Sequence, residues 1–310
     1  MDASEHDKQQ RTGVAQAVGA YCIWGFMPVF FKLFEGVPAM EVVSHRVIWC
    51  VPLLLAILFL RGQLRNLRAA LLDIKALRLL LLSAILIAAN WLIYIFAVTH
   101  DHVVAASLGY FLNPLLNVLL GYLFLSERLG RVQLAAVAMA ALGVAILATG
   151  ALDTLWISIG LAVSFGFYGL VRKIAPVESL PGLTVETLLL APFALGYAVW
   201  IAQTGPGTGW GSNAGMTGLL ILSAGITAMP LLLFGSAARK IGYGTIGFIQ
   251  YIGPSIQFLF AVLIYKESLN LSQIACFALI WSALALFSWD AWQRYRSGEA
   301  VKKAAARSLT

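Results

Sequence analysis

The sequence predicts an all-α integral membrane protein of ten transmembrane helices, arranged as two five-helix repeats of inverted topology. Three observations lead to this prediction. Hydrophobic residues make up 60% of the 310 residues and charged residues only 11%, whereas a soluble domain usually has roughly 25% charged residues. Apolar runs of about 20 residues, the length that crosses a bilayer, recur along the whole chain. The two halves of the chain also share one pattern of polar residues.

The apolar runs define the expected spans and their limits. A polar N-terminal segment, 1–12, precedes them and a basic tail, 291–310, follows. In chain order, the expected spans are residues 13–34, 40–60, 77–98, 103–125, 131–150, 154–171, 182–202, 216–238, 243–265 and 271–290. The loops that join them are short, which is typical of a compact helical bundle.

The internal repeat is clearest between the fourth and ninth spans. At an offset of 140 residues, the matched pairs are Pro114 and Pro254, Asn117 and Gln257, and Glu127 and Glu267. We therefore expect a first repeat at 13–150 and a second at 151–290. Five spans per repeat is an odd number, so the second repeat enters the membrane from the opposite side. Inverted repeats of this kind are the plan of many secondary transporters.

Positive charge is distributed unevenly between the two sides of the membrane. If the N-terminus is cytoplasmic, 18 of the 21 Lys and Arg residues lie in cytoplasmic segments, as the positive-inside rule requires. The C-terminus is then cytoplasmic too. We attribute the net charge of +7 to this asymmetry and expect no nucleic-acid partner.

Three polar residues enter the second span, where hydrocarbon makes charge costly. Glu41 and His45 are four residues apart and share a helix face, and Arg46 lies about two turns into the span. One interpretation is a substrate or counter-ion site, with His45 and Arg46 in the substrate pathway, or part of a proton relay through Glu41 and His45, because charges inside a membrane are usually functional. A structural ion pair near the outer surface, with Arg46 snorkelling, is the other.

Spans four and nine carry polar stripes at helical spacing beside prolines. Proline inside a helix frees a backbone carbonyl and permits a kink, so we expect kinks at Pro114 and Pro254. The stripes are expected to line a polar pathway, although amides that bond across helices would give the same pattern. The stripe residues are Tyr110, Asn113 and Asn117 in span four, and Gln250, Tyr251 and Gln257 in span nine.

Amphipathic residues at depth in other spans extend this predicted pathway. They are Trp24, Asn90, Trp91, Tyr94 and Tyr168. Such rings suit a planar or apolar substrate, and ordinary core packing is the alternative. Glu186, one turn into span seven, is a further candidate for carrying protons.

Spans five and ten have small residues at close-packing spacing and few polar ones. We expect them to be peripheral, or to form a homodimer contact. No metal or cofactor is expected, because the His100–His102 turn lacks distant partner ligands and the three cysteines are far apart. The glycine pattern at 242–247 is expected to open a span, so we do not interpret it as a dinucleotide site.

Several long motifs resemble one known family over about residues 10–295. They include Tyr21–Gly25, Ser44–Trp49, Ser107–Pro114, Ser164–Lys173 and Phe248–Pro254. These stretches are similar to the RarD, or chloramphenicol-sensitivity, family in the EamA branch of the drug/metabolite transporter superfamily. The resemblance implies two EamA repeats in the bacterial inner (plasma) membrane, and a permease that exports small metabolites or drugs. It also implies that helices 5 and 10 lie outside the central pore.

Two rival functions differ from this expectation in what they require. A membrane-embedded enzyme would need catalytic carboxylates or histidines clustered at one interface, and the sequence has no such cluster, so we expect no enzyme. A membrane-embedded sensor or assembly partner would bind a small molecule without net flux, and this alternative stays open.

Overall fold

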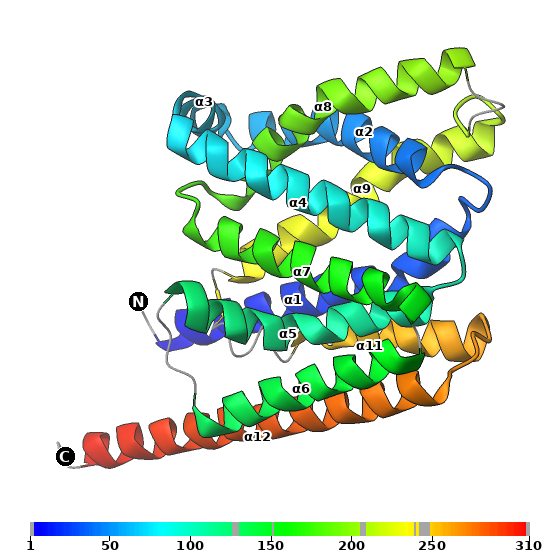
Figure 1. Cartoon of the computed structure of the whole chain (residues 1–310). Coiled ribbons are helices and arrows are strands. Elements are labelled where there is room, and N and C mark those ends of the chain that lie inside the picture. The colour runs from blue at the N-terminus through cyan, green and yellow to red at the C-terminus, as the bar shows by residue number, and fades with distance from the viewer. Residues whose placement is uncertain are drawn as a thin grey trace.

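The computed structural model describes residues 3–125, 130–150, 152–204, 209–238, 240–241 and 249–307, and these residues form a bundle of helices (Figure 1). In chain order, the helices are α1 (Ala3–Lys32), α2 (Ala39–Leu60), α3 (Leu64–Leu72), α4 (Ile74–Thr99), α5 (Val103–Leu125), α6 (Arg131–Gly150), α7 (Leu152–Ile174), α8 (Ser179–Thr204), α9 (Ala214–Ala238), α11 (Ile252–Leu259), the π-helix η1 (Phe260–Ile264) and α12 (Leu271–Arg307). The described residues contain no β-strand.

Eight of the described helices are long and apolar enough to cross a membrane, namely α1, α2, α4, α5, α7, α8, α9 and α12. Two other expected spans appear as shorter apolar helices, Leu134–Gly150 in α6 and Ile252–Ile264 in α11 with η1. Large apolar side chains point outward, such as Phe59 at 70% exposure and Phe193 at 77%. This surface is suited to lipid, and the protein is therefore an all-helical, multi-pass membrane protein.

The ends of the first and last helices differ from the sequence-based boundaries. Helix α1 begins at Ala3, inside the segment expected to precede the first span, and α12 continues to Arg307, through the basic tail. Both extensions are rich in residues with high helix propensity, such as Ala, Lys, Gln and Glu, so a helix that starts in the membrane continues at little cost. Glu127 and the 242–247 glycine pattern lie outside the described residues.

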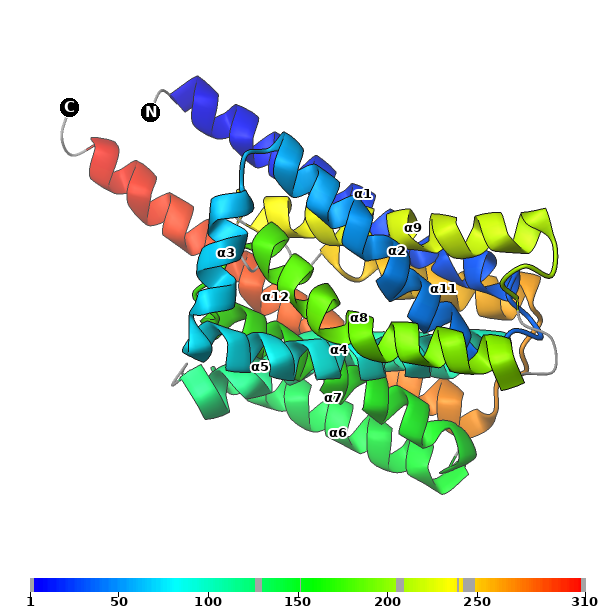
Figure 2. The ribbon, with the colours of Figure 1, turned by 90° about the horizontal axis from the view of Figure 1, so that it is seen from above.

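A short helix, α3, occupies a region that was expected to be a loop. Leu67 and Ala70 are three residues apart and are buried, whereas Arg65 and Arg68 are exposed. This amphipathic pattern lets α3 lie across the ends of α4 and α8 (Figure 2). Asp73 then caps α4, because its Oδ1 accepts hydrogen bonds from the backbone N–H of Lys75 at 2.9 Å and Ala76 at 3.2 Å, which is typical N-cap geometry.

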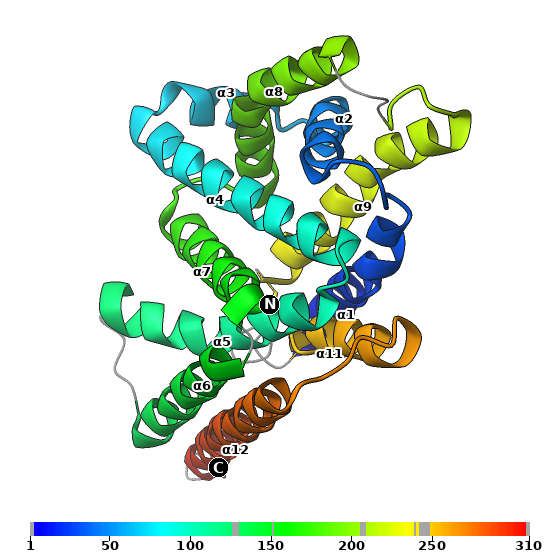
Figure 3. The same cartoon turned by 45° about the vertical axis from the view of Figure 1, so that its right-hand side comes forward.

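Helices from the two halves of the chain pack against one another. Helix α1 packs on α9 and α11, while α7 packs on α4 and α5. Helix α2 contacts α8, and α6 contacts α12. The helices α6 and α12 form a pair at one edge of the bundle (Figure 3), as the small residues of these spans predicted. Gly143 of α6 lies at this contact, and a Cβ there would meet the Cys276 carbonyl oxygen of α12 at 3.4 Å, an ordinary van der Waals distance.

The two termini lie at the same end of the bundle (Figure 1). The α6–α7 junction and the turns at 33–38, 100–102 and 209–213 lie at the opposite end, hereafter the far end. Termini at the same end are what an even number of membrane crossings produces.

Candidate functional site

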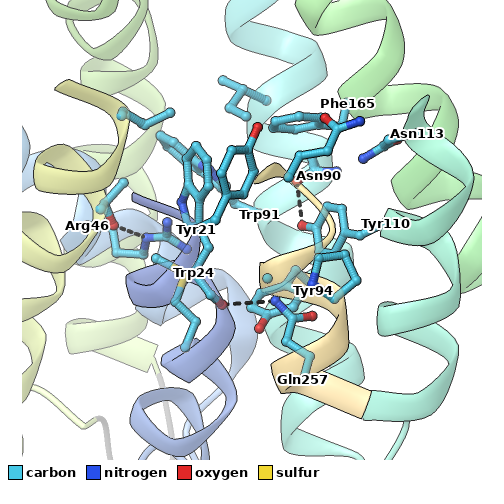
Figure 4. Close-up of a pocket in the computed structure, with 17 residues that line it drawn as sticks. Tyr21, Trp24, Arg46, Asn90, Trp91, Tyr94, Tyr110, Asn113, Phe165 and Gln257 are labelled. Carbon is cyan, nitrogen blue, oxygen red and sulfur yellow. Dashed lines mark hydrogen bonds between the residues drawn. The ribbon is translucent and has the colours of Figure 1, made fainter. Parts of the chain in front are cut away.

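The site begins with a cavity enclosed between helices of both halves (Figure 4). It contains about 730 Å³ of space free of protein atoms, counting the part that opens to solvent. The residues that line it are Tyr21, Trp24, Met27, Arg46, Ile87, Asn90, Trp91, Tyr94, Tyr110, Asn113, Phe165, Thr227, Leu231, Gln250, Gly253, Pro254 and Gln257.

Arg46 supplies a buried positive charge at one side of the cavity. Its side chain reaches from α2, is 2% exposed, and its Nε donates a hydrogen bond to the Thr227 hydroxyl of α9 at 2.8 Å. The guanidinium carbon lies 4.6 Å from the centroid of the Trp91 ring and 5.0 Å from that of Phe31. Cation–π contacts of this kind stabilise a desolvated cation by about 2 kcal/mol, against an insertion cost of roughly 2.5–3.5 kcal/mol.

Asn90 joins three helices beside the cavity. Its Nδ2 donates to the Leu161 carbonyl at 3.2 Å and to the Ser164 hydroxyl at 3.0 Å, both on α7. The Tyr110 hydroxyl of α5 donates to Asn90 Oδ1 at 3.0 Å. Because these hydrogen bonds tie both α5 and α7 to α4, Asn90 holds this wall of the cavity in place.

The segment around Pro254 lines the cavity between α1 and α5. Gln257 Nε2 donates to the Trp24 carbonyl at 2.9 Å, and the Ser107 hydroxyl donates to the Pro254 carbonyl at 2.9 Å. Gly25 lets α1 approach α11 closely, since a Cβ at this position would lie 2.8 Å from the Ile256 Cβ. Pro254 lines the cavity, whereas Pro114 is buried within α5 and does not.

Four lining residues hold polar atoms without a hydrogen-bond partner among the described residues. They are Arg46 Nη1, Tyr94 Oη, Asn113 Oδ1 and Gln257 Oε1. An unsatisfied buried polar atom costs about 1–3 kcal/mol, so such atoms are rare unless a ligand or water meets them. Arg46 and Asn113 lie on opposite sides of the cavity (Figure 4). These four residues therefore place polar atoms without a protein partner among the described residues in the walls of the cavity.

His45, expected in the substrate pathway, and Glu41, expected in a proton relay, do not line this cavity. Glu41 Oε1 accepts a hydrogen bond from the Trp210 backbone N–H at 3.0 Å. The His45 ring stacks on the Trp210 indole, with centroids 4.8 Å apart and planes 14° apart. Both residues are turned toward the far-end loop because they lie on a different face of α2 from Arg46, and they hold that loop against the bundle.

Glu186 lies in a second polar cluster, also outside the cavity. Its carboxylate is 1% exposed and forms an ion pair with Arg172, with Oε1 and Nη1 3.3 Å apart. The Ser83 hydroxyl donates to the same oxygen at 2.5 Å, and Tyr168 forms another hydrogen bond with the carboxylate. Gly182 makes room for the guanidinium, because a Cβ there would lie 2.1 Å from Arg172 Nη1. Tyr168 is thus a partner of Glu186 and does not line the cavity.

Two more expected pathway residues lie elsewhere. Asn117 is exposed, and Tyr251 stacks on Phe111 with centroids 6.4 Å apart. The cavity also has residues that the sequence did not single out, namely Tyr21, Met27, Ile87, Phe165, Thr227, Leu231 and Gly253. Tyr21 and Phe165 lie about one helical turn before Trp24 and Tyr168, so helical spacing could have indicated them; Met27, Ile87 and Leu231 are ordinary apolar residues, which carry no such signal.

Polar contacts also join the two halves at the far end. The Glu267 carboxylate accepts hydrogen bonds from the backbone N–H of Val103 and Val104, each at 2.9 Å, at the start of α5. Burial raises the pKa of Glu267, and these two hydrogen bonds oppose that rise. Lys32 and Asp101 form an ion pair nearby. Within the described ranges, no three His, Cys, Asp or Glu side chains are grouped to hold a metal ion.

A multi-pass membrane protein whose helices enclose a polar cavity is the class that this fold and site define. The model of the EamA-like transporter family matches residues 11–149, which is the first expected repeat. Curated relatives match nearly the whole chain. "Protein RarD" of Salmonella typhimurium is 46% identical, covering 94% of this chain and 98% of the relative. An "Uncharacterized transporter" of Vibrio cholerae is 43% identical, covering 98% of this chain and 100% of the relative.

The chain belongs to the RarD family of EamA-like membrane transporters. "Protein RarD" of Escherichia coli is 43% identical over 94% of this chain and 97% of its own length. A solved crystal structure shares 17% identity and covers 91% of this chain and 99% of its own, with a TM-score of 0.60. That likeness shows the fold alone.

Proposed function

We propose that this protein is a secondary transporter of the bacterial inner membrane that exports small metabolites or drugs by alternating access. The single observation that carries the proposal is the cavity, because helices of both halves line it and four of its lining residues hold polar atoms without a partner in the described part of the chain. Two halves that rock against each other would expose such a central site first to one side and then to the other.

The pairing of the helices supports an inverted repeat with ten crossings. If α1 and α7 are mates, as are α4 and α9, and α5 and α11, exchanging the halves converts the two most extensive contacts of α1 into the two most extensive contacts of α7. The contact of α1 with α9 becomes that of α7 with α4, and the contact of α1 with α11 becomes that of α7 with α5. In this scheme α6 and α11 with η1 are the two remaining spans.

The far-end contacts support a gate. Glu41 with Trp210 and Glu267 with the start of α5 each join a residue of one half to a residue of the other. Rocking the halves would have to break these contacts to open the far end. With the termini in the cytoplasm, the far end faces the periplasm.

Proton exchange is our proposed source of energy, with Glu186 as the carrier. Its carboxylate is buried and touches Ser83 of the first half and Arg172 of the second, so a change in its charge would alter a contact between halves. Flux in proteoliposomes that is the same with and without a pH gradient would rule this out. Glu41 and His45 are weaker candidates because both already hold the Trp210 loop.

The experiment for export has two stages. The growth medium of cells that over-express the protein is first compared by mass spectrometry with that of cells that lack it. Compounds enriched in the medium are then tested for counterflow with the purified protein in proteoliposomes. Counterflow of at least one enriched compound is expected. Binding of such a compound without counterflow would instead indicate a membrane-embedded sensor or assembly partner.

A homodimer through α6 and α12 remains a proposal of its own. Leu134 and Leu142 on α6, and Ile274 and Trp281 on α12, are 45–59% exposed, which leaves an apolar outer face on this peripheral pair. Cross-linking through a cysteine at position 142 in membranes is expected to yield a dimer, and a monomer alone would contradict it.

A further inference from the structure

Arg46 differs from the other buried guanidinium in having no carboxylate. Arg172 is paired with Glu186, whereas none of the ion pairs among the described residues involves Arg46. The two carboxylates buried in the same bundle have other partners, since Glu41 accepts from the Trp210 backbone and Glu186 pairs with Arg172. A buried charge without a counter-ion is strongly disfavoured, so this site is incomplete as it stands.

The surroundings of Arg46 leave one part of its guanidinium free. The rings of Trp91 and Phe31 lie over the group at 4.6 Å and 5.0 Å, and Nε is used by Thr227 at 2.8 Å. Nη1 has no partner among the described residues, and Arg46 lines the cavity. A carboxylate is the most favourable partner of a guanidinium, because the two groups can form parallel hydrogen bonds.

The remainder of the cavity suits a planar apolar body with a few polar hydrogens. Tyr21, Trp24, Trp91 and Phe165 supply aromatic surface, and such rings pack well against a flat ligand. Asn113 Oδ1 and Gln257 Oε1 are acceptors without donors among the described residues. They would accept N–H or O–H groups of the ligand on the side away from Arg46.

We propose that the cargo of this cavity is a small organic anion, in which one carboxylate pairs with Arg46 and an aromatic or otherwise planar body lies against the cavity's rings. This inference rests on the proposed transport function and defines its substrate class. The cargo supplies the counter-charge that the protein lacks, so a loaded site is electrically paired and an empty one is not. A neutral analogue of the same shape fits the cavity but leaves Arg46 unpaired.

The test measures binding by the full-length protein in lipid nanodiscs, using calorimetry at pH 7. The probes are two matched pairs, indole-3-acetate with indole-3-acetamide and phenylacetate with phenylacetamide. Each acid differs from its amide mainly in charge. We expect each acid to bind at least about tenfold more tightly than its amide, the discrimination that about 1.4 kcal/mol of added interaction gives. Equal binding of acid and amide, or no binding of either acid, would overturn the inference.

Variants then connect the preference to Arg46. Arg46→Gln should reduce acid binding at least about tenfold and leave amide binding unchanged, and Arg46→Lys should retain part of the preference because it keeps the charge but not the planar fork. Lys32→Gln is the control, since it also removes one positive charge but lies at the far end, paired with Asp101; its preference should stay that of the wild type. An Arg46→Lys or Arg46→Gln protein that keeps the full preference would assign the selectivity to another group.

The binding test of the anion site and the flux test of the transport proposal can fail independently of each other. Acid binding with no counterflow of any compound would refute transport and leave the anion site standing. Counterflow of neutral compounds in preference to acids would refute the anion site and leave transport standing. If Arg46→Gln does not fold, the acid-to-amide ratio of the wild-type protein still decides the question.

Discussion

The buried pair of Arg172 and Glu186 permits a quantitative test of how the two halves are held together. Glu186 is 1% exposed and Arg172 is 14% exposed, and their charged atoms are 3.3 Å apart. We consider three variants, Glu186→Gln, Arg172→Gln and the double variant. Glutamine has nearly the shape of glutamate, so Glu186→Gln is mainly a change of charge. Arg172→Gln also shortens the side chain and leaves two N–H donors in place of five.

The size of the effect follows from what each variant leaves behind. Removing one partner of a buried pair costs about 3–5 kcal/mol. Glu186→Gln should cost about 3 kcal/mol, because the remaining Arg172 is partly exposed and also donates to the carbonyls of Glu178 at 3.4 Å and Ser179 at 3.5 Å. Arg172→Gln should cost about 4 kcal/mol, because it leaves a carboxylate that is almost fully buried with only the hydroxyl groups of Ser83 and Tyr168.

The double variant should cost about 2 kcal/mol less than the sum of the single ones, which is the coupling expected of directly contacting groups. The assay is thermal unfolding of the detergent-purified protein, followed by intrinsic fluorescence. In a chain of this length, 1 kcal/mol shifts Tm by about 2 °C, so the single variants should melt about 6–8 °C below the wild type.

A matched control uses the other ion pair. Asp101 is 66% exposed, so Asp101→Asn removes a surface pair and should cost less than about 1 kcal/mol. Strictly additive shifts in the Arg172 and Glu186 cycle, or single shifts no larger than that of Asp101→Asn, would refute the reasoning that burial makes the first pair important.

Three further predictions concern packing, the far-end loop and pH. Gly109→Ala should lower stability by about 1–3 kcal/mol, because the new Cβ would lie 2.7 Å from a backbone carbonyl oxygen of α7. Gly169→Ala is the control: its Cβ meets no atom within 4 Å, so it should be neutral or stabilising. Equal Tm values for the two variants would contradict this prediction. Trp210→Ala removes the stacking on His45 and should increase deuterium uptake in its loop, and unchanged uptake would show that the ring does not hold it. Burial raises the pKa of Glu267 above 4.5. The contribution of this group to stability is therefore present below about pH 4.5 and is lost as the pH rises through the folded-state pKa. Glu267→Gln should abolish this part of the pH dependence of Tm, and a variant with the wild-type pH profile would contradict the prediction.

The membrane class, most of the helices and the family follow from the amino-acid sequence alone. A span is recognised from about 20 consecutive apolar residues, and that property is local in the chain. The polar stripes of spans four and nine were predicted to line a pathway; Tyr110, Asn113, Gln250 and Gln257 line the cavity, whereas Asn117 and Tyr251 do not. Helix α3 was missed because its nine residues are too short for a span and alternate between apolar and basic.

Which side chains meet in the folded protein depends on how each helix is rotated about its own axis. Glu41, His45 and Arg46 are close in sequence, and the predictions for them were a substrate or counter-ion site, a proton relay, or an ion pair near the outer surface. In the folded chain, Glu41 and His45 contact Trp210, while Arg46 contacts Trp91, Phe31 and Thr227 on three other helices.

The linear sequence records that a polar residue lies at a given depth but not which neighbour it meets. Partners 45 to 181 positions away along the chain, such as Trp91 and Thr227 for Arg46, are selected by the packing of whole helices. That packing minimises the free energy of many side chains together, so a charge without its counter-ion becomes visible only in the tertiary structure.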